Sequence, residues 1–442
     1  MKSFSASSFA SDNAVALEFA AEAVKDNPYA LFTDFQWFLL AGRDTVFFTA
    51  FSKSRFDKEM VESMVEQMVV LAPQLTHGFK GARPGHRFPA HILHEITSVE
   101  EVDSLEGYPD KWLSSSQDVF EHPDLPLFRV MAANLKDGPD AQGRMSIIQV
   151  RSAHCLMEGS DAALLTRSQT ANHGIQSNKG NKLGFFKRLR GAISGGLMAT
   201  LFAGAGNLVN APERPLSFRT LALPRQRIRA LATKLGVRQR SLYFALATFA
   251  LHSQKERRVK DKVITAAYTM LDTNRTASDD DFFRVRALQA SFPFHDDFIT
   301  YAHAVDNEMG TGEKKDITKF QLTVLAMMGA MRRLGRVFPW MVNDKVWRFQ
   351  GSQADLVLTL VPPHRSMGAL TDWMVEPIYC GAFHQSTNIC TFCPGREFMT
   401  LNFVVEERHI ESIDRIERLI VELEGKDLKP VVSARAEDRE LA

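Results

Sequence analysis

The chain has few cysteines and no excess of charge of either sign. Four cysteines in 442 residues do not make the disulfide framework of a small secreted domain. The first residues lack the apolar core of a secretory signal peptide, so we expect a cytoplasmic protein with reduced thiols. A net charge of +1, with no basic stripe that carries interleaved aromatic residues, argues against a nucleic-acid partner. No GxGxxG or Walker loop is present to cradle a nucleotide phosphate.

Local clusters of histidine and cysteine do not predict a metal site or a redox site. The segment 91–95 (HILHE) lacks the residue order of zinc-protease helices and has no third ligand nearby. Cys390 and Cys393 have the spacing of a redox pair, but on a strand positions i and i+3 point to opposite faces. Cys155 follows His154 directly, and adjacent side chains at a strand end diverge, which argues against a cysteine nucleophile. We therefore expect no metal and no bound cofactor.

The length of 442 residues suits two domains, and 45% apolar with 24% charged residues is typical of a globular protein. Strand-like and helical segments alternate in both halves, which predicts an α/β fold with two sheet-containing domains. We place the first domain at 1–180, a connection at 181–215, the second domain at 216–427 and a charged tail at 428–442.

Several elements have clear boundaries. In the predicted helix 56–71 we expect Met60, Met64 and Met68 to share a core face, with a break at Pro73. A second helix, after a strand at 218–223, is predicted to end at Gly236. Further strands are predicted at 143–154, 263–271, 356–361, 389–392 and 399–405.

The connection contains a short basic segment, 182–190, followed by residues 191–212, which carry no charge. The uncharged segment is long enough to cross a bilayer but contains five glycines and several polar residues. Three interpretations follow: a helical connection packed on the protein, peripheral contact of 182–212 with a membrane or lipid droplet, and a true membrane span.

The segment 151–160 (RSAHCLMEGS) is the most informative part of the sequence. It places His154 at the end of a strand, with Glu158 and Gly159 following. A histidine at such a position is suited to act as a general base, because its ordinary pKa lies near working pH. Considered alone, His154 fits a structural, partly buried histidine at least as well.

The pattern Ala153-His154…Glu158-Gly159 resembles the HHxxxDG motif of acyl-CoA-dependent acyltransferases, in particular the bacterial wax ester synthase/diacylglycerol acyltransferase family. The resemblance makes His154 the catalytic base and gives Glu158 and Gly159 the role of shaping the loop. In this chain alanine replaces the first histidine and glutamate replaces the aspartate.

Further segments resemble the same family in the same order along residues 25 to 425. They are 124–129 (DLPLFR), 236–242 (GVRQRSL), 360–364 (LVPPH) and 387–389 (TNI). The resemblance implies substrate contacts at Ser241, Pro362 and Asn388. The family's Asn-Asp pair is absent at 240–241, and the asparagine that precedes its Val-Pro is absent before Val361.

The resemblance implies two chloramphenicol-acetyltransferase-like lobes with mixed sheets flanked by helices, and an active-site tunnel at their interface with His154 midway along it. The implied reaction transfers a long acyl chain from acyl-CoA, the co-substrate, to a hydroxyl acceptor such as diacylglycerol or a fatty alcohol. The 32 phenylalanines fit either an acyl tunnel or ordinary cores. Two alternatives stay open: an inactive relative that binds lipid or a partner, and transfer from a carrier-protein thioester or to a non-lipid acceptor such as an amine. The sequence does not indicate the oligomeric state.

Overall fold

The computed structural model describes most of the chain between residues 34 and 426. The described residues are 34–71, 73–80, 83–114, 119–122, 124–157, 185–209, 216–252, 263–271, 285–293, 295–314, 318–361, 374–384 and 387–426.

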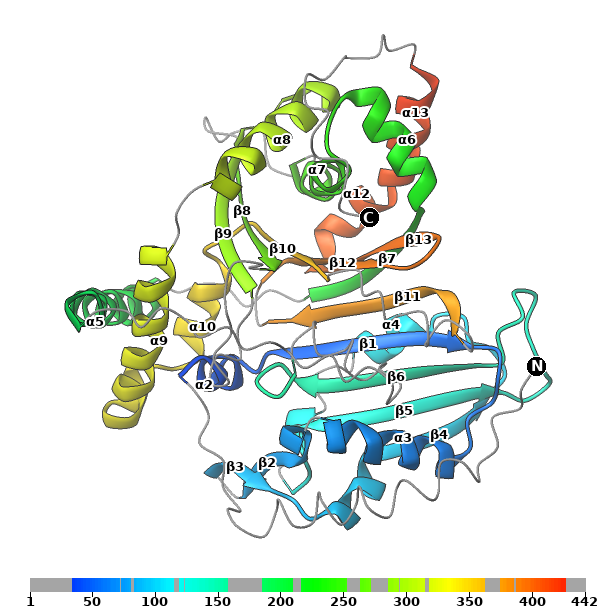
Figure 1. Cartoon of the computed structure of the whole chain (residues 1–442), viewed down its shortest axis with the longest axis horizontal. Coiled ribbons are helices and arrows are strands. Elements are labelled where there is room, and N and C mark those ends of the chain that lie inside the picture. The colour runs from blue at the N-terminus through cyan, green and yellow to red at the C-terminus, as the bar shows by residue number, and fades with distance from the viewer. Residues whose placement is uncertain are drawn as a thin grey trace.

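Two mixed β-sheets form two lobes, one above the other in Figure 1. The first sheet has the strand order β11-β1-β6-β5-β4, and only its β4–β5 pair is parallel. Its strands are β1 (Thr45–Ser52), β4 (Thr97–Val102), β5 (Phe128–Leu135), β6 (Ser146–Ala153) and β11 (Met374–Phe383). A separate hairpin is formed by β2 (His77–Lys80) and β3 (Arg83–Arg87).

Helix α3 (Lys58–Leu71) packs against the first sheet through Val61, Val65 and Met68, with Met64 partly buried beside them. Val61 and Val65 are fully buried, whereas Met60 is 40% exposed. The expectation that Met60 belongs to the core was wrong, because the branched side chains one position further along fill the face that meets β4 and β5. On another part of the sheet, α4 (Tyr108–Ser114) places Trp112 in a small cluster with Phe51.

The second sheet has the order β7-β13-β12-β10-β8-β9, with β10 parallel to both of its neighbours. Its strands are β7 (Leu216–Pro224), β8 (Val263–Leu271), β9 (Val285–Pro293), β10 (Leu356–Leu360), β12 (Ile389–Pro394) and β13 (Phe398–Glu406). The helices of this lobe are α6 (Arg225–Leu235), α7 (Gln239–His252), α8 (Phe298–Lys314), α12 (Ile410–Asp414) and α13 (Ile416–Gly425).

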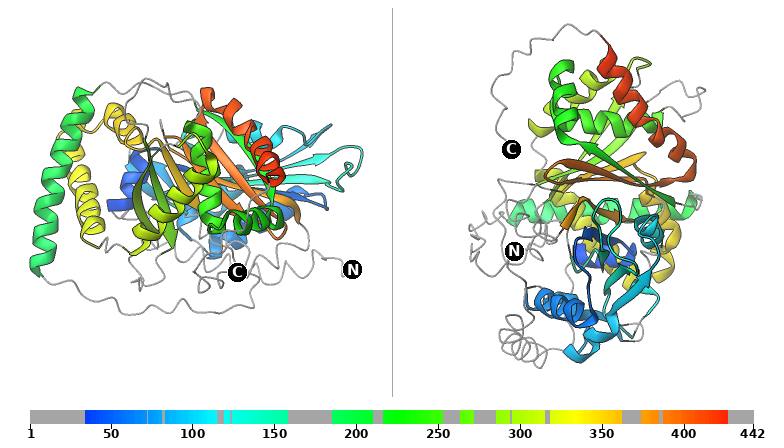
Figure 2. Two further views of the ribbon diagram at one scale, coloured as in Figure 1. Left: turned by 90° about the horizontal axis from the view of Figure 1, so that it is seen from above. Right: turned by 90° about the vertical axis from the view of Figure 1, so that its right-hand side faces the viewer.

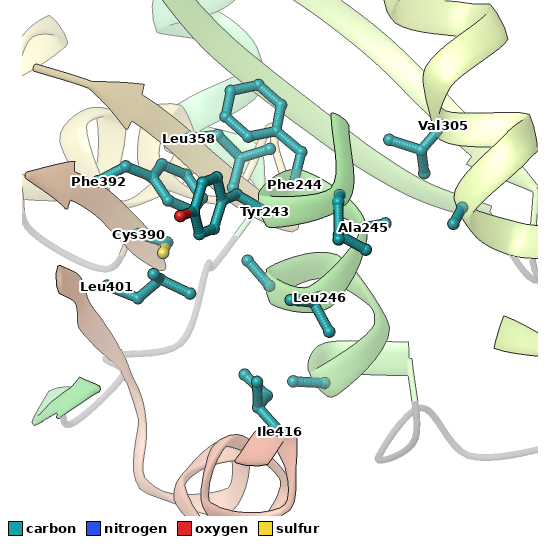
Figure 3. Packing of buried hydrophobic residues seen from close by; sticks show 14 of the residues in the cluster. Tyr243, Phe244, Ala245, Leu246, Val305, Leu358, Cys390, Phe392, Leu401 and Ile416 are labelled. Carbon is teal, nitrogen blue, oxygen red and sulfur yellow. The ribbon is translucent and has the colours of Figure 1, made fainter. Parts of the chain in front are cut away.

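Helix α7 forms the centre of the second lobe and is buried between the sheet and the other helices (Figure 3). The ring of Phe244 on α7 packs against Phe392 on β12, with ring centroids 5.1 Å apart. Helix α6 ends where the sequence predicted, at Gly236, which has φ 70° and caps the helix with two backbone hydrogen bonds. The predicted α/β fold with two sheet-containing lobes is confirmed.

Strand β11 was not predicted, and it ties the two lobes together. It comes from the second half of the chain but forms the edge of the first sheet, and β12, which follows it, lies in the second sheet. Thr400 on β13 donates a hydrogen bond to the carbonyl of Ile378 on β11 at 2.6 Å. The Glu376 carboxylate on β11 accepts backbone N–H groups of the β12–β13 turn, including those of Glu397 and Phe398 at 2.9 and 3.0 Å. The lobes are therefore joined by polar contacts as well as by the chain.

A third group of helices lies beside the lobes: α2 (Asp34–Ala41), α5 (Phe185–Leu208), α9 (Thr318–Val337) and α10 (Asp344–Gly351) (Figure 2). Helix α5, which contains most of the predicted connection, packs along α9 and contacts α10. None of the described helices has both the length and the apolarity that a membrane span requires, so α5 does not fit the span interpretation.

His77 on β2 is a buried histidine held in its neutral form. Its Nδ1 donates to the carbonyl of Gln74 at 2.7 Å, and its Nε2 accepts from Arg87 Nε at 3.0 Å. Burial, with the nearby Arg87 charge adding a smaller effect, lowers the pKa of His77 from 6.5 to about 4. Its backbone carbonyl also accepts the N–H of Leu127 at 2.9 Å, which fixes the predicted 124–129 segment beside the sheet.

We expect His77 to make the protein less stable in acid. Since the folded-state pKa lies below the unfolded one, its effect is absent above pH 6.5 and grows as pH falls toward 4. The free energy of unfolding should drop by about 3 kcal/mol over that window because of this residue. Urea titrations at several pH values should show a shallower loss in His77→Gln, whose uncharged amide offers a donor and an acceptor in place of the two ring nitrogens. An equal loss in both proteins would contradict the assignment.

Candidate active site

Three strand ends of the first sheet place two imidazoles and a carboxylate in one row. Strand β1 lies between β6 and β11 and is antiparallel to both. Its first residue, Thr45, pairs with the last residue of each neighbour. Asp44 therefore lies between His154, which follows β6, and His384, which follows β11. Residues directly opposite on antiparallel strands point to the same face, so the three side chains meet.

Asp44 contacts both histidines. One carboxylate oxygen, Oδ1, accepts a hydrogen bond from Nδ1 of His384. The other, Oδ2, lies 4.0 Å from Nδ1 of His154, which is an electrostatic contact rather than a hydrogen bond. The Asp44 carbonyl also accepts the backbone N–H of His154 at 2.7 Å. A carboxylate that is only 10% exposed is thus held against partners of opposite polarity, as a buried charge requires.

His384 is held at both ring nitrogens. Its Nε2 faces the side-chain oxygen of Gln350, which comes from α10 in the third group of helices. Its side chain is 9% exposed, so it lies behind Asp44 rather than at the surface. Three parts of the chain, far apart in sequence, thus fix the orientation of this ring.

His154 is the member of the row that solvent reaches, with 22% of its side chain exposed. Burial lowers its pKa from the ordinary 6.5, the Asp44 carboxylate opposes that shift, and His384 adds to it. The imidazole is therefore neutral at pH 7. With its Nδ1 edge toward Asp44, the neutral ring favours a proton on Nδ1 and leaves Nε2 free to accept one. That is the state that a general base needs.

Asp44 lies in the turn that ends α2, and this turn lacks the glycine that is usual at the left-handed position of a helix C-terminus. Arg43 N–H donates to the carbonyl of Leu40 at 3.1 Å, and Asp44 N–H donates to that of Leu39 at 3.0 Å, the bond pattern of a Schellman motif. Arg43 occupies the left-handed position of this motif, with φ 53°. The preceding Gly42 has no room for a side chain, since a Cβ there would lie 2.8 Å from Asp44 Oδ1.

Cys155, next to the base, does not suit a nucleophile. It is fully buried, and burial raises the pKa of its thiol far above the ordinary value, so the sulfur stays protonated. Its carbonyl accepts a hydrogen bond from the Gln36 side chain at 3.1 Å, which ties the turn after β6 to α2. The prediction that Cys155 is structural agrees with this position.

Of the other predicted site residues, the structure describes Asn388 and Ser241. Asn388 begins the segment that leads into β12; its amide donates to the Asp355 carbonyl at 3.0 Å and accepts from the Glu406 N–H at 2.9 Å. Ser241 is fully buried on α7, and its hydroxyl has no hydrogen-bond partner within the part of the chain that the structure describes. Glu158, Gly159 and Pro362 lie outside the described residues. Their roles, and the tunnel, stay predictions.

Sequence reasoning missed Asp44, His384 and Gln350. Asp44 is one acidic residue before a strand and matches no motif, and His384 follows a strand that was not predicted. Strand pairing alone places Asp44 and His384 beside His154 at one edge of the sheet.

The remaining histidine and cysteine clusters of the described residues make other contacts. Within the described ranges no group of three His, Cys, Asp or Glu side chains has metal-binding geometry. His94 instead pairs with Glu62 on α3 at 3.1 Å. Cys390 and Cys393 point into different hydrophobic clusters, as predicted from their spacing.

Comparison with known proteins supports the fold but does not assign a family. No family model matches the sequence, and a search of curated proteins finds no match. Among solved structures, the chain is similar to the wax ester synthase/diacylglycerol acyltransferase from Marinobacter aquaeolei VT8, with a TM-score of 0.53 and 15% identity, covering 88% of this chain and 97% of that one. It is also similar to TRI3 trichothecene 15-O-acetyltransferase from Fusarium sporotrichioides, with a TM-score of 0.55 and 12% identity, covering 89% and 94%.

A third similar structure is the first condensation domain of the calcium-dependent antibiotic synthetase, with a TM-score of 0.50 and 12% identity, covering 92% of this chain and 98% of that one. Together these likenesses show that the chain has the two-lobed fold shared by acyltransferases and condensation domains.

The two neighbours of His154 should shift the pH dependence of its chemistry in opposite directions. Asp44→Asn removes the charge that raises the pKa of His154, so the acidic limb of kcat/KM should move to lower pH. His384→Gln removes the group that lowers this pKa, so the limb should move to higher pH. His303→Gln on α8 is the matched control and should leave the profile unchanged. Shifts of both site variants in one direction would contradict the proposed electrostatics.

The turn before β1 predicts a contrast between adjacent substitutions. Arg43→Gly should preserve activity and raise the free energy of unfolding by about 1 kcal/mol, since glycine adopts φ 53° without strain. Gly42→Ala should displace Asp44 and His384 and lower kcat with little change in KM. Thermal melts and steady-state kinetics test both; a fully active Gly42→Ala variant would show that the position of Asp44 is unimportant.

Proposed function

We propose that the protein is an acyltransferase that moves an acyl group from acyl-CoA to a hydroxyl acceptor, a fatty alcohol or diacylglycerol, with His154 as the general base. The observation that carries the proposal is the neutral, partly exposed His154 with its Nδ1 edge toward a buried carboxylate. The fold supports it, because two similar structures are named as acyltransferases, one of them an O-acetyltransferase.

The chemistry follows from the orientation of the ring. An alcohol is a weak acid, so its oxygen becomes a good nucleophile only as its proton leaves. Nε2 of His154 accepts that proton while the oxygen attacks the thioester carbonyl, forming a tetrahedral oxyanion. Collapse of this intermediate breaks the carbon–sulfur bond, and the imidazolium returns the proton to the leaving thiolate. The products are an ester and free CoA, and the histidine ends in its starting form.

Asp44 contributes by stabilising the imidazolium that exists between the two proton transfers. Its carboxylate is already buried and oriented, so little reorganisation is needed when His154 becomes positive. His384 and Gln350 keep the carboxylate in position. In this proposal Glu158 and Gly159 shape the turn after His154, and Asn388, Pro362 and Ser241 contribute to substrate binding.

Substitution of His154 tests the proposal. His154→Ala should lower kcat for thiol release by a factor of 10²–10⁴ with little change in KM, the range expected for loss of a general base. The measurement is thiol release from acyl-CoAs of two to eighteen carbons, with fatty alcohols and diacylglycerol as acceptors. Ester formation should match thiol release one to one.

Two controls separate the alternatives. Cys155→Ala, beside the base, should retain turnover, because the thiol has no role in the reaction. Unchanged turnover in His154→Ala would refute the base assignment. If the folded wild-type protein turns over pantetheine thioesters but not acyl-CoA, the acyl donor in the proposal is wrong and a pantetheine thioester takes its place. If it turns over neither, the proposed enzymatic function is refuted.

A further inference from the structure

One face of helix α5 packs against its neighbours through small residues. Ala199 and Ala203 are buried, and a Cβ added to Gly195 would lie 2.5 Å from the Cβ of Ala326 on α9. A Cβ on Gly206 would lie 2.9 Å from the backbone of α10. The backbone of α5 thus sits directly against two helices, and the face that makes this contact holds only glycine and alanine at these positions.

The opposite face of α5 exposes large apolar side chains. Ile193, Leu197, Leu201 and Leu208 are 60–87% exposed. At 100° per residue they fall within about 80° of one another, opposite the glycine and alanine face. A surface helix of a globular protein ordinarily does the reverse and turns its large apolar residues inward. Within the part of the chain that the structure describes, this stripe is exposed.

The end of α9 and the turn after it continue the apolar surface. Val337, Phe338 and Trp340 are 67%, 45% and 68% exposed. Eleven large hydrophobic side chains are exposed in the described residues. Nine of them lie on α5, directly after α5, or between Val337 and Trp340. A groove of about 550 Å³ runs between the two helices, lined by Ile193, Gly196, Ala199, Thr200, Ala330, Arg333, Leu334, Val337 and Phe338. We call this surface the α5–α9 face.

The two helices of the α5–α9 face carry basic residues and no acidic ones. The sequence of α5 contains three basic residues and that of α9 contains four, and neither helix contains an aspartate or glutamate. The whole chain has a net charge of only +1, so the remainder is acidic on balance. Arg333 and Arg336 are exposed beside the groove. Figure 2 shows α5 at one end of the molecule, on the far side of α9 from the lobes.

We propose that the α5–α9 face docks onto the surface of an anionic phospholipid membrane. Its leucines and Trp340 would enter the interfacial region, where tryptophan is favoured, while its arginines meet the lipid phosphates. The helices lie on the surface and do not cross it. A second copy of the chain fits less well, because a symmetric dimer would bring two acid-free, basic faces together.

The same face is mechanically connected to the candidate active site. Helix α10 packs against α5 through Val346 and carries Gln350, which contacts His384. Docking therefore places the row of strand ends one helix away from a reservoir of lipid. The proposal itself does not depend on acyl transfer, since membrane binding is measured without turnover.

Flotation of the full-length chain with large unilamellar vesicles tests the proposal. The wild type should float with vesicles of phosphatidylcholine containing 40% phosphatidylglycerol and bind pure phosphatidylcholine at least tenfold more weakly. Leu197→Gln/Leu201→Gln should reduce the partition coefficient at least tenfold, and Arg333→Gln/Arg336→Gln about tenfold. All four positions are exposed, so thermal melts should match the wild type.

Val421→Gln is the matched control, because Val421 on α13 is 58% exposed but lies outside the α5–α9 face. It should bind vesicles like the wild type. Trp340 supplies a second readout: anionic vesicles should shift the tryptophan emission of the wild type to shorter wavelength, and Trp340→Phe should lose that shift.

Failure to float with anionic vesicles at low salt would overturn the proposal. So would binding that none of the α5–α9 substitutions weakens. A wild type that is dimeric by light scattering, and that Leu197→Gln/Leu201→Gln converts to monomer without affecting vesicle binding, would show that the face joins two copies instead. Each of these results leaves the kinetic test of His154 unaffected.

Discussion

The pairing of β1 with both β6 and β11 is the constraint on which the rest of the site depends. A single register sets Thr45 opposite the last residues of two strands, and the next position outward on each strand is a member of the candidate site. Because residues across an antiparallel pair share a face, strand pairing alone brings His384, Asp44 and His154 together. A slip of one residue in either ladder would turn a histidine to the opposite face.

The row also links the active-site chemistry to the architecture of both lobes. β11 reaches the first sheet only because the chain crosses from the second lobe, and the crossing is held by Glu376 and Thr400. The position of His384 therefore depends on correct docking of the two lobes. Its other partner, Gln350, depends on α10 and hence on the helices outside the lobes. A buried carboxylate with two imidazole neighbours is stable only when all three parts are in place, since an unpaired buried charge is strongly unfavourable.

Two features of the chain depart from ordinary local preferences, one beside the candidate site and one on the α5–α9 face proposed for membrane docking. Arg43 takes a left-handed conformation that glycine adopts more easily, and it does so one residue before Asp44. Helix α5 turns leucines outward and packs Gly195 and Gly206 against neighbouring helices. Such departures are retained where a specific geometry matters more than local stability. For Arg43 that geometry is the orientation of the Asp44 carboxylate. For α5 it is the exposed apolar surface.

Local signals in the sequence were enough for the α/β class, for the boundaries of β8 and α6, and for His154 as the candidate base. These features depend on neighbours within a few residues: alternation, helical spacing, a glycine at a helix end, a histidine at the end of a strand. On α3, Met68 is buried as predicted, but the expectation for Met60 was wrong, because spacing alone does not tell where the edge of an apolar stripe meets the sheet. Asp44 and His384, by contrast, are separated by 340 residues, and no local pattern connects them. Only the tertiary structure decided that they meet, because strand pairing between distant segments is fixed by the packing of whole sheets, and it is this packing that sets the protonation and orientation of His154.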